Sequence, residues 1–249
     1  MAGILPSCFK VDFNCVSINI SQEVQLAWDR FDPSTSVKLH ILHCPSIEIP
    51  KSFQRFRRLT EIWVYNSTIV EWGAEAAITS THHPDMAMVS MVRINMTGGS
   101  LPLGFQSLEF PLSLLDINFC ETNLRTLPDD LDTKWHIDSS ILLENSEFTE
   151  VPPVLMRLQP SPGMIDITNT NISSFWSWVD PLVKNTQGIM IPIIAGGSRY
   201  CAERESIMNG DIDTFSEPFH PGESSLLMNA SKGIGMFCLL VWIVPPQPR

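Results

Sequence analysis

The stretch SLLDINFCETNLRTLPDDL, residues 113–131, carries the pattern that decides the fold of this chain. Leu115 and Ile117 flank one polar residue, a spacing typical of a short strand with both apolar side chains on one face. Cys120 follows three residues later, where a small side chain can meet the backbone of a turn. A Leu-Pro pair near the end of the stretch closes the motif. A single copy proves little, so the fold depends on whether the motif recurs.

The motif recurs along the chain at a period that can be counted. The second apolar residue of each copy is Ile18, Ile41, Val64, Ile94, Ile117, Leu143, Ile167 or Ile191. The steps are 23, 23, 30, 23, 26, 24 and 24 residues, within or next to the roughly 20 to 29 residues of a leucine-rich repeat. Two residues earlier stand Val16, Leu39, Ile62, Val92, Leu115, Ile141, Ile165 and Ile189. Three residues later stand Ser21, Cys44, Ser67, Thr97, Cys120, Ser146, Thr170 and Ile194, of which all but the last are small hydrogen-bonding residues.

The agreement of these three columns predicts a leucine-rich-repeat solenoid, an α/β horseshoe. A curved parallel sheet would form its concave side, with loops, 3₁₀ turns and short helices on the convex side. We divide the chain into an N-terminal cap with a degenerate first repeat (1–35), the repeats (36–200), and a C-terminal cap with an irregular tail (201–249). The alternative is an ordinary sandwich of short strands, which antiparallel pairing of residues 39–41 with 62–64 would favour.

Composition and motifs narrow the classes of function. The net charge of −11 argues against nucleic-acid binding, which needs clustered Lys and Arg. We expect no catalytic residues, because the usual hydrolase, phosphate-loop and kinase motifs are absent from the sequence. We also expect no cofactor and no metal site: His82 and His83 have no carboxylate or Cys at ligand spacing. A small hydrolase or metal-dependent enzyme on a β scaffold is retained as the alternative function.

The six cysteines lack the CxxC spacing of zinc or thioredoxin sites. Cys44 and Cys120 fall in the column of small residues, where we expect buried free thiols. Cys8, Cys15 and Cys201 lie towards the ends of the chain, where secreted repeat proteins often have capping disulfides, and their pairing is left open.

The chain carries more glycosylation motifs than its composition explains. Five N-x-S/T sequons begin at Asn19, Asn66, Asn95, Asn171 and Asn229. The 12 asparagines would give about two sequons by chance. Residues 1–10 do not have the features of a signal peptide, so we expect an extracellular protein whose leader is missing from this chain. The apolar residues 233–244 are too few to span a bilayer, and membrane association through them or through a missing leader stays open.

The predicted concave face presents the residues that alternate with the buried pairs. The candidates for ligand binding there are Trp63, Tyr65, Arg93, Asp116, Leu142, Glu144 and Asp166. Trp63 and Tyr65 occupy alternate positions of one strand, so both rings should be exposed on this face. Arg93 should lie level with Trp63 on the next strand, within reach of a cation–π contact.

Several blocks also resemble a known family. They are HCPSIEIP (43–50), VYNSTIVEW (64–72), RINMTGGSLP (93–102), FCETNLRTLPDDLDTKW (119–135) and FTEVPPVLMRL (148–158). Over roughly residues 15–201, the chain is similar to oomycete leucine-rich-repeat proteins, which are extracellular or membrane-anchored repeat modules. The resemblance implies a solenoid at the cell surface or outside the cell. It further implies a non-enzymatic recognition module that binds a protein or peptide ligand.

Overall fold

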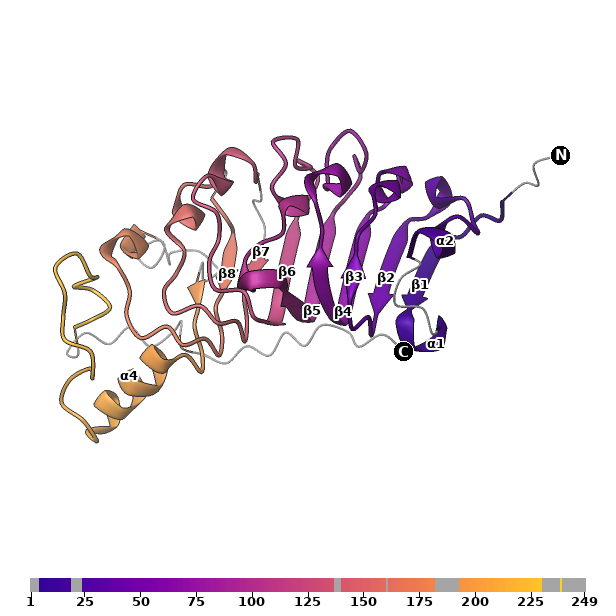
Figure 1. Ribbon diagram of the computed structural model, residues 1–249. Coiled ribbons are helices and arrows are strands. Elements are labelled where there is room, and N and C mark those ends of the chain that lie inside the picture. Colours follow the sequence, from indigo (N-terminus) through magenta and orange to yellow (C-terminus); the bar gives the residue numbers. More distant parts are fainter. Residues whose placement is uncertain are drawn as a thin grey trace.

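The computed structural model describes residues 5–18, 24–136, 140–159, 161–181 and 193–229, together with Cys238, of the 249-residue chain. Nine strands of this part form one open sheet, in which all strand pairings are parallel. The strands are β1 (Lys10–Asn14), β2 (Lys38–Leu42), β3 (Ile47–Glu48), β4 (Glu61–Glu71), β5 (Met88–Met96), β6 (Asp116–Thr122), β7 (Ser140–Leu142), β8 (Met164–Asp166) and β9 (Ile193–Ile194). They follow one another in chain order, except that β3 pairs beside this path with β4 (Figure 1). The parallel pairing of β2 with β4 contradicts a sandwich of antiparallel strands.

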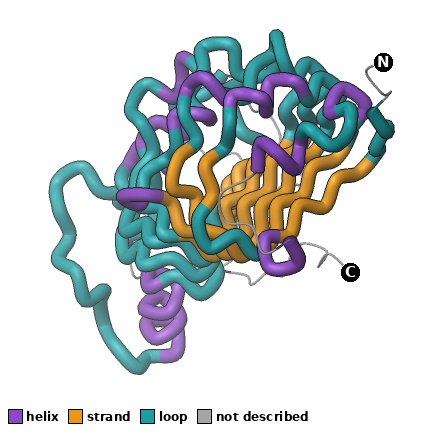
Figure 2. Tube along the Cα trace, turned by 45° about the vertical axis from the view of Figure 1, so that its right-hand side comes forward, coloured by secondary structure: helices purple, strands orange, loops and turns teal. Residues whose placement is uncertain are grey.

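Helices are short, and most are single 3₁₀ turns. The α-helices are α1 (Cys15–Ile18), α2 (Val24–Trp28) and α4 (Arg199–Asn209). The 3₁₀ helices are η1 (Pro33–Thr35), η2 (Lys51–Arg55), η3 (Ala74–Ala76), η4 (Thr97–Gly99), η5 (Leu103–Phe105), η6 (Leu131–Thr133), η7 (Pro153–Met156) and η8 (Ser177–Val179). Loops (teal) and short helices (purple) connect the end of each strand to the start of the next and lie away from the sheet (Figure 2). In the described residues, no helix has the length and apolarity needed to cross a bilayer.

Each main strand contributes two apolar side chains to a common core. From β2 to β8 the pairs are Leu39/Ile41, Ile62/Val64, Val89/Met91, Ile117/Phe119, Ile141/Leu143 and Ile165/Ile167. All twelve side chains have no exposed surface. Because successive strand residues point to opposite faces, these pairs bury one whole face of the sheet. The pairs predicted for β2, β4, β7 and β8 are confirmed.

The pairs predicted for the first and middle repeats are wrong in register. Val16 is 75% exposed and belongs to α1, whereas β1 places Val11 and Phe13 beside Leu39 and Ile41. The segments before and after residue 15 both alternate apolar and polar residues, so periodicity alone does not separate them. Ser21, Ile189 and Ile191 lie outside the described residues.

A similar ambiguity displaced the predictions for β5 and β6. In β5, Val89 and Met91 enter the core and so does the predicted Ile94, whereas Val92 pairs with Tyr65 of β4. In β6, Leu115 precedes the strand and is 50% exposed. Both repeats contain two overlapping apolar pairs, at 89/91 and 92/94 and at 115/117 and 117/119. The wrong member was predicted each time: the predicted steps from Val64 to Leu143 are 30, 23 and 26 residues, whereas the core pairs of the structure, through Met91 and Phe119, give 27, 28 and 24.

Small polar side chains connect some neighbouring repeats, as predicted, but Ile94 and Thr122 occupy this column in the repeats for which Thr97 and Cys120 were predicted. The backbone N–H of Cys44 donates to Ser67 Oγ at 2.9 Å. Between the repeats of β6 and β7, Thr122 Oγ1 lies 3.3 Å from Ser146 Oγ, which also donates to the Phe119 carbonyl at 3.1 Å. These bonds satisfy buried backbone and hydroxyl groups inside the stack. Thr122, rather than Cys120, is the member of this column in its repeat.

Two disulfides lie at the two ends of the described sheet. Cys15 bonds to Cys44, so the expectation of a free thiol at Cys44 is wrong. Cys201 of α4 bonds to Cys238. Cys8 and Cys120 are free thiols, and Cys120 is only 6% exposed. The low exposure predicted for Cys120 is confirmed, but its side chain lies opposite Val92, on the other face of the sheet from Ile117.

Candidate binding surface on the polar face of the sheet

The face of the sheet opposite the apolar core, called the polar face below, has a middle row of side chains in register across eight strands. From β1 to β9 the row is Asp12, His40, Trp63, Ser90, Asn118, Leu142, Asp166 and Ile194. From His40 to Ile194, every member is at most 9% exposed. The middle row is therefore largely closed to solvent, and accessible groups lie along its flanks.

Trp63 occupies the predicted face but is not the exposed anchor that the sequence suggested. It is 7% exposed, and its ring centroid lies 5.6 Å from that of His40. Its position between His40 and Ser90 confirms the register of this repeat. Within the described part of the chain, Trp63 Nε1 makes no hydrogen bond.

Arg93 contacts Tyr65 instead of Trp63. Its Nη1 donates to the Tyr65 hydroxyl at 3.1 Å, and its guanidinium carbon lies 5.8 Å from the centre of the Tyr65 ring. Its Nε also donates to a Glu121 carboxylate oxygen at 2.6 Å. The Glu121 carboxylate raises the pKa of Arg93, first through hydrogen bonding. Tyr65, Arg93 and Glu121 thus form a bonded cluster across β4, β5 and β6.

The position of Arg93 follows from its backbone conformation. Its φ of 58° is in the left-handed region, so the alternation of side chains along the strand is interrupted there. The same conformation occurs in six successive repeats, at His43, Asn66, Arg93, Glu121, Asn145 and Asn169, with φ between 47° and 55° in the other five. These six residues are called the ridge below.

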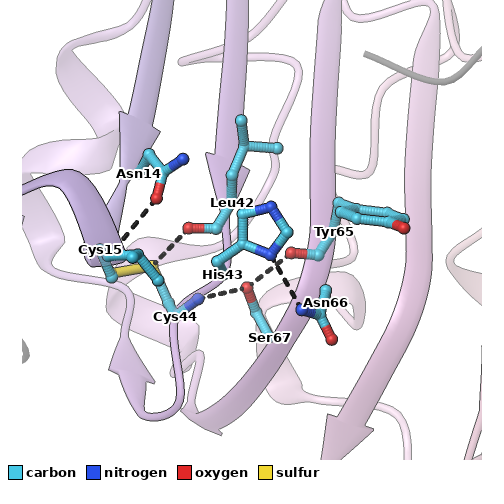
Figure 3. Close-up of a disulfide and its surroundings, with 9 residues drawn as sticks. Asn14, Cys15, Leu42, His43, Cys44, Tyr65, Asn66 and Ser67 are labelled. Atoms are coloured by element: carbon cyan, nitrogen blue, oxygen red, sulfur yellow. Dashed lines mark hydrogen bonds between the residues drawn. A yellow bond between two sulfur atoms is a disulfide. The ribbon is translucent and has the colours of Figure 1, made fainter. Parts of the chain in front are cut away.

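Each ridge residue lies two residues after the core pair of its repeat. Asn66, Arg93 and Glu121 lie within β4, β5 and β6, and the other three follow their strands. Five of its residues are exposed and His43 is half-buried. Asn66 Nδ2 lies 2.8 Å from His43 Nδ1, and this pair stands next to the Cys15–Cys44 disulfide (Figure 3). Asn tolerates the left-handed conformation better than most residues. Its presence at three of six positions was a signal in the sequence that the periodicity argument did not use.

An open groove of about 390 Å³ lies beside the N-terminal half of the ridge. Its walls are formed by Val16, His43, Cys44, Pro45, Asn66, Ser67, Thr68, Arg93 and Asn95. The lining combines apolar surface with two amides, hydroxyls, an imidazole and a guanidinium. Such groups can bind a ligand that both donates and accepts hydrogen bonds.

The C-terminal half of the polar face holds three carboxylates from the predicted set. Asp116 is half-buried at the start of β6, and Glu144 follows β7. Asp166 in β8 has no exposed surface; its Oδ1 accepts from the Thr168 backbone N–H at 2.9 Å, and its Oδ2 has no partner among the described residues. Burial, followed by the nearby Asp166, raises the pKa of Glu144 to about 7. Burial also raises the pKa of Asp166.

Leu142 and Cys120 complete this half of the face. Leu142 lies between Asn118 and Asp166 in the middle row and is 9% exposed. Burial, with the charge of Glu144 next, raises the pKa of the Cys120 thiol to about 11. Since the thiolate is the reactive form, Cys120 is a poor nucleophile at neutral pH.

Glu144 gives this face a pH dependence that can be measured. Because its folded pKa of about 7 exceeds the ordinary 4.5, the folded protein holds this proton more tightly than the unfolded chain does. The resulting stability is fully present below about pH 4.5 and is lost as the pH rises through 7.

Between about pH 5 and pH 8, the free energy of unfolding should fall by about 1–2 kcal/mol more in the wild type than in the Glu144→Gln variant, after allowance for solvent screening. Urea unfolding of both proteins at the two pH values measures this difference. Glu48→Gln, at an exposed position, is the control and should follow the wild type. Parallel losses in the wild type and Glu144→Gln would contradict the assigned protonation.

The N-terminal end of the polar face is an ion-pair cluster. His40 Nε2 lies 3.3 Å from a Glu61 oxygen, and His40 Nδ1 lies 3.2 Å from an Asp12 oxygen. Lys38 also pairs with Glu61. Burial, and then the charge of Lys10, lowers the pKa of His40. Among the described residues, no group of three or more His, Cys, Asp and Glu side chains is arranged to hold a metal ion.

The predicted sequons differ in their surroundings. Asn66, Asn95 and Asn171 are exposed, and Asn229 is half-buried. Asn19 lies outside the described residues. Comparison with protein-family models and with curated proteins found no match for this chain.

Proposed function

We propose that this chain is a leucine-rich-repeat solenoid that acts as a non-enzymatic recognition module for a protein or peptide partner. The observation that carries the fold is the parallel order of the strands with a core pair and a left-handed residue at matching positions. A stack in which each repeat contacts only its neighbours explains why these columns recur. The resemblance to oomycete leucine-rich-repeat proteins agrees with this proposal.

The ridge is the part of the polar face that supports a binding role best. Five of its six side chains are exposed, and their positions are fixed by the parallel strands that contain or precede them. At its centre Arg93 is held by both Tyr65 and Glu121, so little side-chain entropy is lost when a partner binds. Arg and Tyr are also frequent among residues that dominate binding energy. Asp116 and Glu144 are half-buried and would contribute mainly charge and shape, whereas Leu142 and Asp166 are buried in the middle row and would not reach a partner.

An extracellular or cell-surface location is part of the proposal. Two disulfides fit an oxidising compartment, where such bonds persist. The excess of sequons agrees with a secretory route. Membrane association through residues 233–244 or a leader is a further possibility that cell fractionation would test.

The test compares two exposed arginines that each pair with a carboxylate. Arg93 pairs with Glu121 on the ridge, and Arg55 of η2 pairs with Asp29 at 2.7 Å, away from the polar face. Full-length wild type, Arg93→Ala and Arg55→Ala, produced without N-glycans, are immobilised and exposed to extracellular protein from the source organism. The captured partner is then purified, and its affinity for each protein is measured.

Arg93→Ala should weaken binding by about tenfold, the effect of losing one well-placed anchor. Arg55→Ala should bind as the wild type does, and circular dichroism should show that both variants are folded. Equal affinity of the wild type and Arg93→Ala would exclude the centre of the ridge as the contact.

A further inference from the structure

We propose that Asn95 carries an N-linked glycan and that the groove beside the ridge holds its first sugar. Asn95 begins the sequon Asn95-Met96-Thr97, and its side chain is exposed at the wall of the groove. Within the described residues its amide makes no hydrogen bond. The nitrogen that would receive the sugar is therefore accessible without breaking a contact of the fold.

The modification needs a defined donor. An oligosaccharide attached to a lipid pyrophosphate would supply the sugar, as in the secretory pathway. A bond forms between Asn95 Nδ2 and the anomeric carbon of the first N-acetylglucosamine, while the bond from that carbon to the lipid pyrophosphate breaks. The amide nitrogen loses one proton and the lipid pyrophosphate leaves, so no oxidant or reductant takes part. The disulfides fit passage through the same oxidising compartment.

The groove matches the chemistry of an amino sugar. Its volume of about 390 Å³ is within the range of small-ligand sites. N-acetylglucosamine presents hydroxyls, which donate and accept, together with an amide N–H and carbonyl. The facing groups of the groove are equally mixed: the Asn66 amide and the Thr68 hydroxyl donate and accept, and the His43 ring offers a second nitrogen beyond the one paired with Asn66. Val16 and Pro45 supply apolar contact for the acetyl methyl group.

The other described sequons do not combine an exposed asparagine without a hydrogen bond and a position on the wall of the groove. The Nδ2 of Asn66 already contacts His43 at 2.8 Å, so a glycan there would disturb a contact of the ridge. Asn229 is half-buried. Asn171 is exposed and makes no hydrogen bond within the described part of the chain, but it is not among the residues that line the groove. Asn171 is therefore the matched comparison for Asn95.

The test is site-resolved glycan release from the full chain made through the secretory pathway of a eukaryotic host. Peptide mapping by mass spectrometry before and after treatment with peptide-N-glycosidase identifies the occupied asparagines. A time course under native conditions gives the release rate at each site. One or two hydrogen bonds to the first sugar should slow release at Asn95 by about tenfold relative to Asn171. In denaturant the release rates at the two sites should converge. If Asn171 carries no glycan, protection at Asn95 is measured instead as the ratio of its native to its denatured release rate.

His43→Ala removes one wall of the groove and should speed native release at Asn95 several-fold without changing it at Asn171. Faster release at both Asn95 and Asn171 would indicate that His43→Ala unfolds the protein rather than opens the groove. In that case Thr68→Ala replaces it, and faster release at Asn95 alone would support the proposal. Absence of a glycan at Asn95, or equal native and denatured rates there, would overturn the proposal. No partner takes part in this measurement, so its failure would leave the proposed recognition function untouched.

Discussion

Replacing Ile117 with Ala should lower the free energy of unfolding by about 2–5 kcal/mol, because a large buried side chain is deleted and a cavity is left. Ile117 has no exposed surface and lies in register with Val89 of β5 and Ile141 of β7. Each repeat packs only on its neighbours, so the loss should extend to both adjacent strands. Equilibrium urea unfolding gives the free energy, and hydrogen exchange of β5 and β7 reports the spread.

Leu115→Ala is the matched control for this prediction. Leu115 was assigned to the same core from the sequence, but it is 50% exposed and precedes β6. Its truncation should change stability by less than about 0.5 kcal/mol, as for ordinary surface substitutions. Comparable losses in the two variants would mean that the register of β6 is that predicted from the sequence. A loss below about 1 kcal/mol for Ile117→Ala would remove Ile117 from the core.

This pair of residues also illustrates what the sequence could and could not predict about the fold. The parallel sheet followed from the period, and the core pairs of β2, β4, β7 and β8 followed from alternation. Those repeats are 23 or 24 residues apart where they are adjacent, so the regular period identified the buried pair. In β5 and β6 two overlapping pairs compete. Which pair is buried depends on the length of the loop that connects one strand to the next, and the alternation of apolar residues carries no information on that length.

The candidate site was predictable to a smaller extent. Strand alternation correctly assigned Trp63, Leu142 and Asp166 to the polar face. It could not give their exposure, since burial of a residue on a sheet face depends on segments far away in the sequence. Arg93 was misplaced because the pair 92/94 was taken for the core pair 89/91, so that Ser90 and not Arg93 lies beside Trp63. Its left-handed φ of 58° then interrupts the alternation of side chains at Arg93 itself. The contact with Tyr65 exists because of that left-handed residue.

Removing the Cys15–Cys44 disulfide should have a comparably large effect, confined to the N-terminal end of the sheet. The bond closes a loop across a sequence separation of 29 residues, for which the chain-entropy account gives about 3–4 kcal/mol. It joins α1 to the turn that follows β2. The double variant Cys15→Ala/Cys44→Ala avoids leaving one thiol free, and Ala keeps the buried position of Cys44 apolar.

Because the repeats are coupled only to their neighbours, the loss should appear first as faster hydrogen exchange in β1 and β2, while β7 and β8 keep their protection. Cys8→Ala is the control: it removes a thiol that forms no disulfide and should change stability by less than about 0.5 kcal/mol. A loss below about 1 kcal/mol in the double variant would show that β1 is held by its pairing with β2 alone. Loss of protection throughout the sheet would instead mean that the described strands unfold as one cooperative unit. In that case the N-terminal disulfide would support the ridge along its whole length, including the cluster of Tyr65, Arg93 and Glu121.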